Sequence, residues 1–258
     1  LNKPIGVMTM MAPALLAPLL TAPRKHDQQI ALALFALLAG VVIPSFSQSA
    51  LLSLVAMVLC YFMPVAAPVF WRLVRGVTIM GLFGLPFIMT PLYNHYADTL
   101  KHTDVMREAA SAERLEIWSA ISQRILERPV FGWGYNAARI LEMPIANVYF
   151  HDPIVAHPHD FVMQIWLESG AVGAVLAAVL FTLLWRGIER EENLDIRRLY
   201  FTSCASVIAF ALVGWNMWQT WWVMTLFLVG VLTLLAARII RAGGFPQSVP
   251  APTSYPKE

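Results

Sequence analysis

Long apolar runs dominate the chain, and a single long polar stretch interrupts them near the middle. A bilayer core about 30 Å thick requires roughly 20 mostly apolar residues per helix. The segments that approach this length are residues 5–22, 28–45, 50–71, 76–93, 162–185, 199–215 and 218–238. The pattern predicts an all-α fold, namely a polytopic transmembrane helix bundle with a large outer loop that contains short helices.

These segments also predict how the chain is organised. The expected parts are four transmembrane helices in 1–93, a long polar loop in 94–161 that is the expected place for function, three helices in 162–240 and a disordered tail in 241–258. Pro13, Pro18 and Pro44 predict kinks in the first two helices, because neighbouring helices can satisfy the freed backbone groups. Since Leu1 leads almost at once into an apolar run, we expect further membrane helices to precede it in the full protein.

Composition and charge support this class and its orientation. The chain is 58% hydrophobic and 13% charged, whereas soluble domains carry about 25% charged residues. No basic patch is interleaved with aromatic residues, so nucleic acid is not an expected partner. Basic residues gather in one set of short loops and in the tail, at Arg24, Lys25, Arg72, Arg75, Arg186, Arg190, Arg197, Arg198, Arg238, Arg241 and Lys257. These loops are expected to be cytoplasmic, which places 94–161 outside.

The first candidate for chemistry is the stretch from Ser111 to Arg128. Arg114, Trp118, Ile121 and Ile125 recur at helical spacing and are predicted to share one helix face. An arginine at the end of an apolar stripe needs an anionic partner. That partner is either an acid of the loop, such as Glu113 or Glu116, or a bound phosphate or diphosphate.

A glycine-rich turn follows this helix, from Pro129 to Tyr135, with the sequence PVFGWGY. Two glycines around a tryptophan after a helix-ending proline predict a tight turn. We interpret the turn as structural. It would direct the following segment back toward the site.

The most informative stretch is His157-Pro158-His159-Asp160, directly before the fifth apolar segment. Pro158 suits the first helical position and Asp160 the first turn, which would place His159 at a helix N-terminus. The helix dipole there disfavours imidazolium, so His159 could accept a proton, and the same N-terminus attracts phosphate. The alternatives are an interfacial histidine pair without a catalytic role and a weakly indicated metal site with His151 and Asp152.

Further polar candidates flank this stretch in sequence. Asp160, Gln164 and Glu168 share a helix face, and an ionisable residue near the membrane edge is either functional or paired with an arginine such as Arg114. Gly170 and Gly173 are expected to allow close contact between membrane helices. The run 45–49, which includes Ser47 and Gln48, could bind sugar or phosphate, or could be an ordinary polar turn.

Four tryptophans gather near the outer end of the last hairpin. They are Trp215, Trp218, Trp221 and Trp222. An aromatic belt at the membrane interface is the favoured interpretation. A platform on which sugars stack is the alternative.

Three motifs in order resemble those of a known family. They are R-x-x-x-W at 114–118, R-P-V-F-G-W-G at 128–134 and H-P-H-D-F-x-x-Q-x-W-x-E-x-G-x-x-G at 157–173. Together they resemble the O-antigen ligase-related domain, which O-antigen ligases, O-antigen polymerases and some exopolysaccharide polymerases share. The resemblance extends over about residues 1–235, the C-terminal two-thirds of such a protein.

The resemblance implies a glycosyltransferase of the bacterial inner membrane whose active site faces the periplasm and uses neither metal nor cofactor. A polyprenyl-diphosphate-linked glycan would be the donor, and lipid A-core or another glycan the acceptor. His159 would be the general base and Arg114 a diphosphate ligand, with His157, Asp160, Gln164, Glu168 and Trp118 around them. We expect one displacement with inversion at the anomeric carbon.

Two positions depart from the family pattern. Asp160 stands where asparagine is usual, and Gln48 stands after Ser47 where many members carry an arginine. The missing diphosphate ligand could be replaced by Arg107, Arg124 or Arg139.

O-antigen ligation to lipid A-core is the expected function. The rival functions are O-antigen or exopolysaccharide polymerisation, protein O-oligosaccharyl transfer and, from another class, transport of a lipid-linked sugar. A membrane scaffold without activity is a further alternative. Transporters carry their polar residues near the bilayer midplane. The polar candidates here gather outside it, which favours an enzyme.

Overall fold

The computed structural model describes residues 2–101, 111–146, 152, 154–214 and 216–244, and all regular elements in these residues are helical. They are α1 (Asn2–Leu20), α2 (Lys25–Val42), the 3₁₀ helix η1 (Ile43–Ser45), α3 (Gln48–Phe62), α4 (Pro68–Lys101), α6 (Ser111–Glu127), the 3₁₀ helix η2 (Ala137–Arg139), α7 (Phe161–Glu189), α8 (Leu194–Leu212) and α9 (Thr220–Arg241). The predicted all-α class is confirmed.

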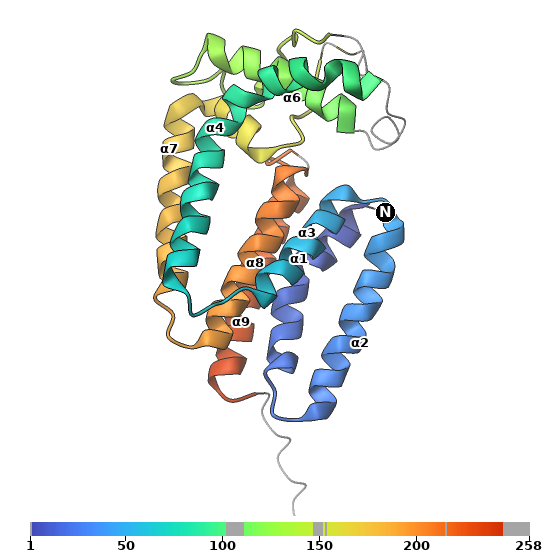
Figure 1. Ribbon diagram of the computed structural model, residues 1–258, viewed down its shortest axis with the longest axis vertical. Coiled ribbons are helices and arrows are strands. Elements are labelled where there is room, and N and C mark those ends of the chain that lie inside the picture. Colours follow the sequence, from blue (N-terminus) through green and yellow to red (C-terminus); the bar gives the residue numbers. More distant parts are fainter. Residues whose placement is uncertain (1, 102–110, 147–151, 153, 215, 245–258) are drawn as a thin grey trace, which may run out of the picture.

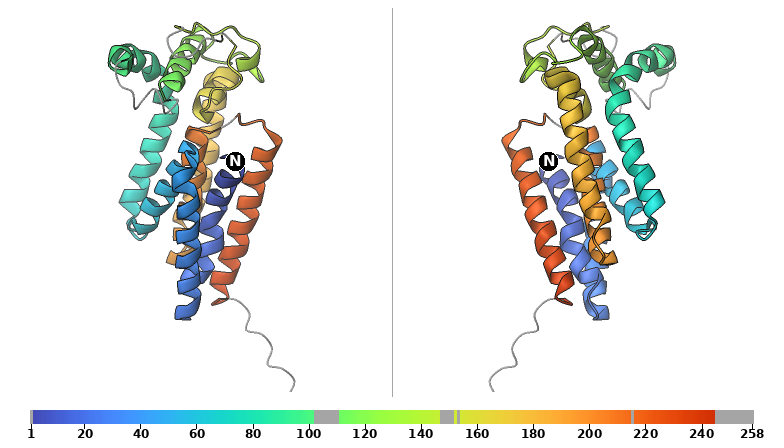
Figure 2. Two further views of the ribbon diagram at one scale, coloured as in Figure 1. Left: turned by 90° about the vertical axis from the view of Figure 1, so that its right-hand side faces the viewer. Right: turned by 90° about the vertical axis from the view of Figure 1, so that its left-hand side faces the viewer.

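The helices form a bundle with a cap at one end (Figures 1 and 2). α1 packs against α2, α3, α8 and α9, and α3 lies along α8. α4 packs against α7, and α6 crosses over their upper ends (Figure 1). Five of the described helices, α1, α2, α4, α7 and α9, are long and apolar enough to cross a membrane, which confirms a multi-pass membrane protein.

The boundaries of α3 and α4 differ from the predicted segments 50–71 and 76–93. α3 ends at Phe62, because Met63 before Pro64 is extended, as residues before proline tend to be. α4 begins at Pro68, a residue suited to the first helical position, and continues to Lys101. The upper turns of α4 therefore lie in the stretch predicted as loop. α3, with 15 residues, is too short to count among the candidate spans.

Prolines inside membrane helices leave carbonyl groups without their usual donor. Pro86 in α4 has no N–H to donate to the carbonyl of Leu82, and the indole N–H of Trp166 in α7 donates to that oxygen instead, at 2.8 Å. Pro13 in α1 is compensated in the same way by the hydroxyl of Ser206 in α8, 3.4 Å from the freed oxygen. These bonds satisfy groups that lipid could not satisfy, and they join neighbouring helices.

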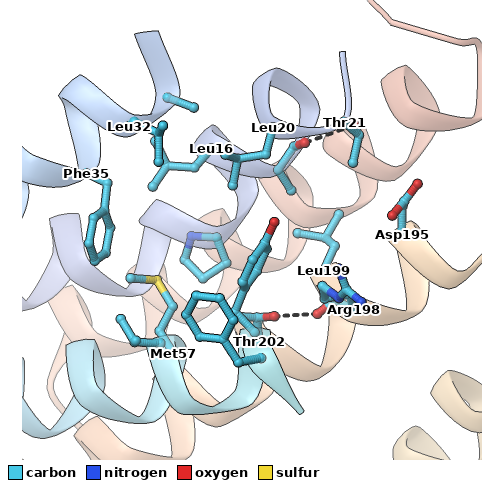
Figure 3. A pocket seen from close by; sticks show the side chains of 16 residues that line it. Leu16, Leu20, Thr21, Leu32, Phe35, Met57, Asp195, Arg198, Leu199 and Thr202 are labelled. Carbon is cyan, nitrogen blue, oxygen red and sulfur yellow. Dashed lines mark hydrogen bonds between the residues drawn. The ribbon is translucent and has the colours of Figure 1, made fainter. Parts of the chain in front are cut away.

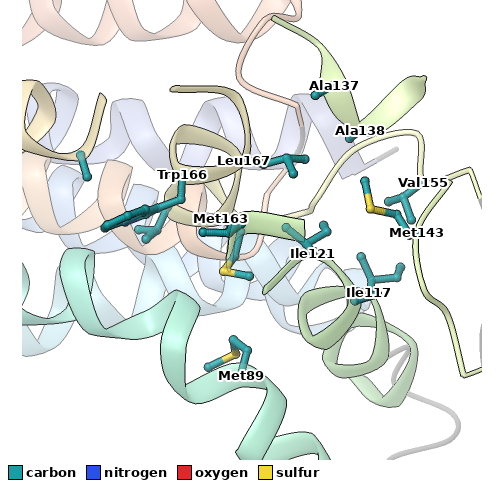
Figure 4. Packing of buried hydrophobic residues seen from close by; sticks show 14 of the residues in the cluster. Met89, Ile117, Ile121, Ala137, Ala138, Met143, Val155, Met163, Trp166 and Leu167 are labelled. Carbon is teal, nitrogen blue, oxygen red and sulfur yellow. The ribbon is translucent and has the colours of Figure 1, made fainter. Parts of the chain in front are cut away.

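A hydrophobic core fixes α6 on the bundle (Figure 4). Ile117, Ile121 and Ile125 of α6 are buried and belong to the same cluster as Met163 and Leu167 of α7. The predicted apolar stripe of this helix is confirmed. Because α6 packs across two helices, its polar residues are held at a fixed height above the bundle.

The opposite end of the bundle contains an apolar cavity of about 340 Å³ among α1, α2, α3 and α8 (Figure 3). Leu16, Phe35 and Met57 line it, and Asp195 and Arg198 are its charged lining residues. These mostly apolar lining residues suit a hydrocarbon chain better than the polar substrates of a transfer reaction. The polar candidates named above lie at the other end of these helices.

α7 is interrupted where the turn of residues 129–134 inserts into it. Gly170 has φ 58° and ψ −152°, so the helical ladder is broken there. The N–H groups of Trp133 and Gly134 donate to the carbonyls of Leu167 and Glu168, at 2.8 and 2.9 Å. In return, the N–H groups of 171 and 172 donate to the carbonyls of 129 and 130, at 2.8 and 3.2 Å. Two helical bonds are thereby replaced by four bonds to the inserted turn.

Glycine is required on both sides of this junction. A Cβ atom on Gly170 would lie 2.5 Å from the carbonyl of Val130, and one on Gly132 would lie 2.6 Å from the backbone of Glu168. Both glycines also have positive φ, which other residues adopt at a cost. The expectation that Gly170 serves contact between membrane helices is therefore wrong, because its partner is the inserted turn.

Gly170→Ala is expected to destabilise the protein, because a Cβ atom there meets backbone rather than a movable side chain. The left-handed backbone alone costs of order 1–3 kcal/mol, or roughly 2–10 °C in the midpoint of thermal unfolding. Thermal unfolding of the detergent-solubilised protein measures this. Gly187→Ala in the same helix is the control, since open space surrounds that position. Equal midpoints for the two variants would contradict the assignment.

Candidate functional site

The segment 157–160 lies beneath α6 at the start of α7. The indole N–H of Trp118 donates to the carbonyl of Pro158 at 2.7 Å, which joins α6 to this segment. The guanidinium of Arg139 donates to the carbonyl of Ala156 at 3.2 Å. The rings of His157 and His159 meet edge to face, with centroids 4.0 Å apart. Both histidines are thus held from two sides.

Asp160 is the N-cap of α7, and its carboxylate accepts from the N–H of Met163 at 2.8 Å. The prediction that Pro158 opens the helix and that Asp160 lies in its first turn is therefore wrong by three residues. An aspartate bonds to free N–H groups at the N-cap more effectively than it could further along. His159 precedes the cap and has φ 58°, a left-handed conformation seen more often for histidine than for most residues.

Arg114 lies close to both histidines. Its Nη1 donates to Oε1 of Gln48, the first residue of α3, at 2.9 Å. Burial lowers the pKa of Arg114, and the nearby Glu113 partly opposes this. Arg114 is thus near Glu113, one of the predicted loop acids, and it also contacts Gln48, which sequence spacing did not indicate. This contact links the cap to the membrane helices.

Both histidines are held neutral. Burial lowers the pKa of His159 to about 4, with smaller contributions from His157 and Arg114, against a hydrogen bond to the backbone of Gly214. Burial likewise lowers the pKa of His157 to about 4, helped by Arg139 and Arg114. The predicted neutral state thus has burial as its main cause, with the nearby arginines as further causes that sequence spacing did not indicate. A neutral imidazole has one nitrogen that can accept a proton.

A buried polar network follows on the same face of α7. The amide of Gln164 donates to Glu168 and to Asn216, each at 2.9 Å, and its oxygen accepts from the N–H of Met217 at 3.0 Å. Glu168 also accepts from the indole N–H of Trp218 at 2.5 Å. Asp160 precedes the helix as its N-cap, but Gln164 and Glu168 do share the predicted buried face. Its partners lie in the connection between α8 and α9 rather than on Arg114.

Other candidates lie apart from this cluster. Arg124 bonds to Glu127 and to the carbonyl of Glu142, ten residues along α6 from Arg114, or about 15 Å of helix rise. Ser47 is buried at the N-cap of α3, where its N–H donates to the hydroxyl of Ser45 at 3.3 Å.

Three candidates lie outside the described residues, namely Arg107, His151 and Trp215. The metal alternative named His151 and Asp152. Within the described ranges, no group of three His, Cys, Asp or Glu side chains could hold a metal ion.

Comparisons with known proteins show the family of the chain. The sequence profile of the O-antigen ligase family matches residues 33–178, which is more than half of the chain. The chain belongs to the O-antigen ligase family. The matched range contains α6, the inserted turn and the first part of α7.

Curated relatives are longer than this chain. Proteins of Rickettsia conorii and Rickettsia typhi, both named "putative polysaccharide ligase", are 26% and 24% identical to it over 176 and 178 residues. Each alignment covers 66% of this chain and 42% of the relative. The chain thus spans about two-fifths of the length of these relatives. No solved structure matches it.

Sequence reasoning missed the part of the site that comes from the α8–α9 connection. Asn216 and Gly214 stand between two apolar segments, where a short polar turn is unremarkable. A buried amide partner for Gln164 was nevertheless to be expected, because buried polar side chains are almost always bonded. Tyr135 was treated as part of a structural turn. In this member of the O-antigen ligase family, it lies next to Trp218, with ring centroids 5.2 Å apart.

The pH dependence of stability provides a test at Asp160. Burial raises the pKa of its carboxyl from 3.8 to about 7, although the N–H groups of Met163 and Val162 act to lower it. The folded protein then binds the proton more tightly than the unfolded chain, so stability falls as the pH rises through this window. Asp160→Asn keeps a cap acceptor without titrating. It should therefore stabilise the protein more at pH 8 than at pH 5.

The measurement is the difference between mutant and wild-type unfolding temperatures at each pH, with about 2–4 °C expected per 1 kcal/mol. The histidines titrate in both proteins, so their opposite contribution cancels in this difference. Asp195→Asn at the other end of the bundle is the control. A difference for Asp160→Asn that stays constant with pH would contradict the raised pKa.

Proposed function

We propose that the protein transfers a polyprenyl-diphosphate-linked glycan to an acceptor sugar, and that its reaction is ligation of O-antigen to lipid A-core. Membership in the O-antigen ligase family supports the general activity. One observation carries the assignment of the site. Arg114, His157 and His159 come from segments more than 40 residues apart and meet beneath α6.

Arg114 is the proposed ligand of the donor diphosphate. A guanidinium carries five N–H donors in a planar fork, more than its contact with Gln48 uses. Arg139, beside His157, is a second cation within reach of the same anion. The N-terminus of α7 contributes less than the sequence suggests, because the Asp160 carboxyl already accepts from its N–H groups. Arg124 is too far along α6 to share this role.

His159 is the proposed general base. It would remove the proton from the acceptor hydroxyl as that oxygen bonds to the anomeric carbon and the bond from this carbon to the diphosphate breaks. A pKa near 4 keeps the ring able to accept a proton, but also makes it a weak base. A diphosphate bound at Arg114 would offset the positive charge of the guanidinium and raise the pKa of His159 toward its ordinary value. Donor binding would thus activate the base, and one displacement would invert the anomeric carbon.

The position of these residues supports an inner-membrane enzyme that faces the periplasm. They lie at the end of the bundle opposite the short basic loops, and the ion pairs Arg75–Glu189 and Arg241–Glu191 lie at the helix ends beside those loops. The positive-inside rule places those loops in the cytoplasm. A transporter would require its substrate-binding groups near the bilayer midplane, whereas Arg114 and both histidines precede α7.

Replacement of His159 tests the base. His159→Ala is expected to lower kcat by about 10²–10⁴-fold and to change the KM for donor little, because the diphosphate contacts remain. Purified full-length protein with lipid-linked donor and lipid A-core provides the assay. His95→Ala, an exposed histidine on α4, is the control. Retained activity in His159→Ala would remove this residue from the mechanism.

The arginine predicts a different kinetic pattern. Arg114→Ala is expected to raise the KM for donor and to lower kcat, each by about 10-fold or more, because a charge-assisted contact is worth roughly 1.5–3 kcal/mol. Initial rates at varied donor concentration separate the two effects. Arg72→Ala, an exposed arginine at the opposite end, should behave as wild type. A normal KM for donor in Arg114→Ala would contradict diphosphate binding.

Surface polysaccharide from a strain that lacks the full-length protein distinguishes ligase from polymerase. Bare lipid A-core together with accumulated lipid-linked polymer indicates a ligase. Core that carries single repeats indicates a polymerase. An unchanged ladder would contradict both and would point to other acceptors.

A further inference from the structure

Two aromatic side chains next to the proposed catalytic cluster are exposed without an evident structural need. Tyr135 is 69% exposed and Trp218 is 46% exposed, and their ring centroids lie 5.2 Å apart at an angle of 60°. They come from the loop after the inserted turn and from the α8–α9 connection. We call them the aromatic pair. An aromatic belt at the membrane surface is the simplest explanation, and the hydrogen bonds of the pair argue against it.

A tryptophan of the interfacial belt keeps its polar edge toward water or lipid headgroups. Trp218 has the reverse orientation. Its indole N–H donates to the buried carboxylate of Glu168 at 2.5 Å, while much of the ring stays exposed. Its main-chain N–H donates to the side chain of Asn216 at 2.9 Å. A charge-assisted bond of this kind fixes the ring plane.

Tyr135 is anchored to the same residue. The N–H of its neighbour Gly134 donates to the main-chain carbonyl of Glu168 at 2.9 Å. Glu168 thus holds the Trp218 ring through its side chain and the backbone next to Tyr135 through its own main chain. The Trp218 ring is held in place before any ligand arrives, so binding to it would lose little conformational entropy.

Trp222 is a tryptophan in this part of the chain with a structural role, and it provides a comparison for Trp218. It is buried and stacks on Phe210 with centroids 5.4 Å apart. Trp218 has no such packing role, since its exposed ring meets Tyr135. Fixed and exposed aromatic rings suit a ligand with a flat apolar face.

A pyranose ring has such a face. Its axial C–H groups carry a slight positive charge and pack against the electron-rich face of an aromatic ring, while its hydroxyls require polar partners at the edge. Asn136, the residue after Tyr135, is half-buried at the edge of the pair, where its side-chain oxygen accepts a hydrogen bond from the buried Asn216 at 3.5 Å. The chemistry of the pair therefore matches a sugar better than a lipid chain.

The distance from His159, the proposed base, indicates whether this sugar belongs to the donor or to the acceptor. Glu168, which holds Trp218, is eight residues along α7 from Asp160, or about 12 Å of helix rise, so we expect the pair to lie beside the reacting atoms rather than on them. The donor already has a charged anchor at Arg114. The reacting hydroxyl of the acceptor is neutral and has no such charged anchor. The acceptor therefore needs a contact of another kind to bring this hydroxyl to His159.

We infer that Tyr135 and Trp218 form a stacking subsite for a sugar ring of the acceptor glycan, an inference that rests on the proposed transferase function. Trp218 supplies the fixed platform, and Tyr135 closes one side. Glu168 is a positioning residue for Trp218.

Tyr135→Ala tests the subsite, because this exposed side chain can be removed without opening the core. It should raise the KM for acceptor about 10-fold, because one of the two aromatic contacts to the sugar ring is lost. The kcat and the KM for donor should remain within about 3-fold of wild type. Tyr135→Phe keeps the ring and should behave as wild type. Phe131→Ala removes an exposed aromatic side chain from the neighbouring turn and is the matched control.

Binding without turnover separates the two proposals. The probe is core oligosaccharide released from lipopolysaccharide, titrated into the full-length protein without donor. Weaker binding by Tyr135→Ala and Trp218→Leu than by Phe131→Ala supports the subsite even if transfer is not detected, in which case only the proposed function fails. Active enzyme with an unchanged KM for acceptor in Tyr135→Ala would overturn the subsite. A raised KM for donor alone would overturn its assignment to the acceptor.

Discussion

The insertion of the 129–134 turn into α7 is the constraint on which the outer end of the molecule depends. A membrane helix cannot open its ladder unless other groups take up the freed N–H and carbonyl groups. Here the turn supplies them, with two donors and two acceptors. Gly132 and Gly170 allow the two backbones to approach closely enough for these bonds. The loop is therefore joined to the membrane helix by main-chain bonds.

The protonation state of the two histidines follows mainly from packing. The N–H groups at the start of α7 are occupied by Asp160, and α6 covers the segment before it. Burial beside cations then keeps His157 and His159 neutral. Gln48 also affects the charges around Arg114. A second guanidinium at that position would repel Arg114, whereas the amide oxygen of Gln48 accepts a hydrogen bond from it.

The fold class and the general location of the site could be predicted from the sequence, because both depend on local patterns. Apolar length gives membrane helices, and helical spacing gives the buried stripe of α6. The end of α3 was misjudged because apolar residues continue through a break that Pro64 imposes. The contacts of Gln48, Asn216 and Gly214 could not be predicted. Each joins segments far apart in the chain, and no local pattern specifies which helix ends will meet.

The family motifs acquire a physical meaning from these contacts. The tryptophan of R-x-x-x-W is Trp118, which bonds to the carbonyl between the two histidines of the third motif. The first glycine of the turn motif faces the backbone around Glu168, and Gly170 faces the turn in return. Motifs that look independent in sequence are thus two sides of the same contacts. An alteration on one side of a contact should affect the same property as an alteration on the other, because each side is bonded only where its partner is correctly placed.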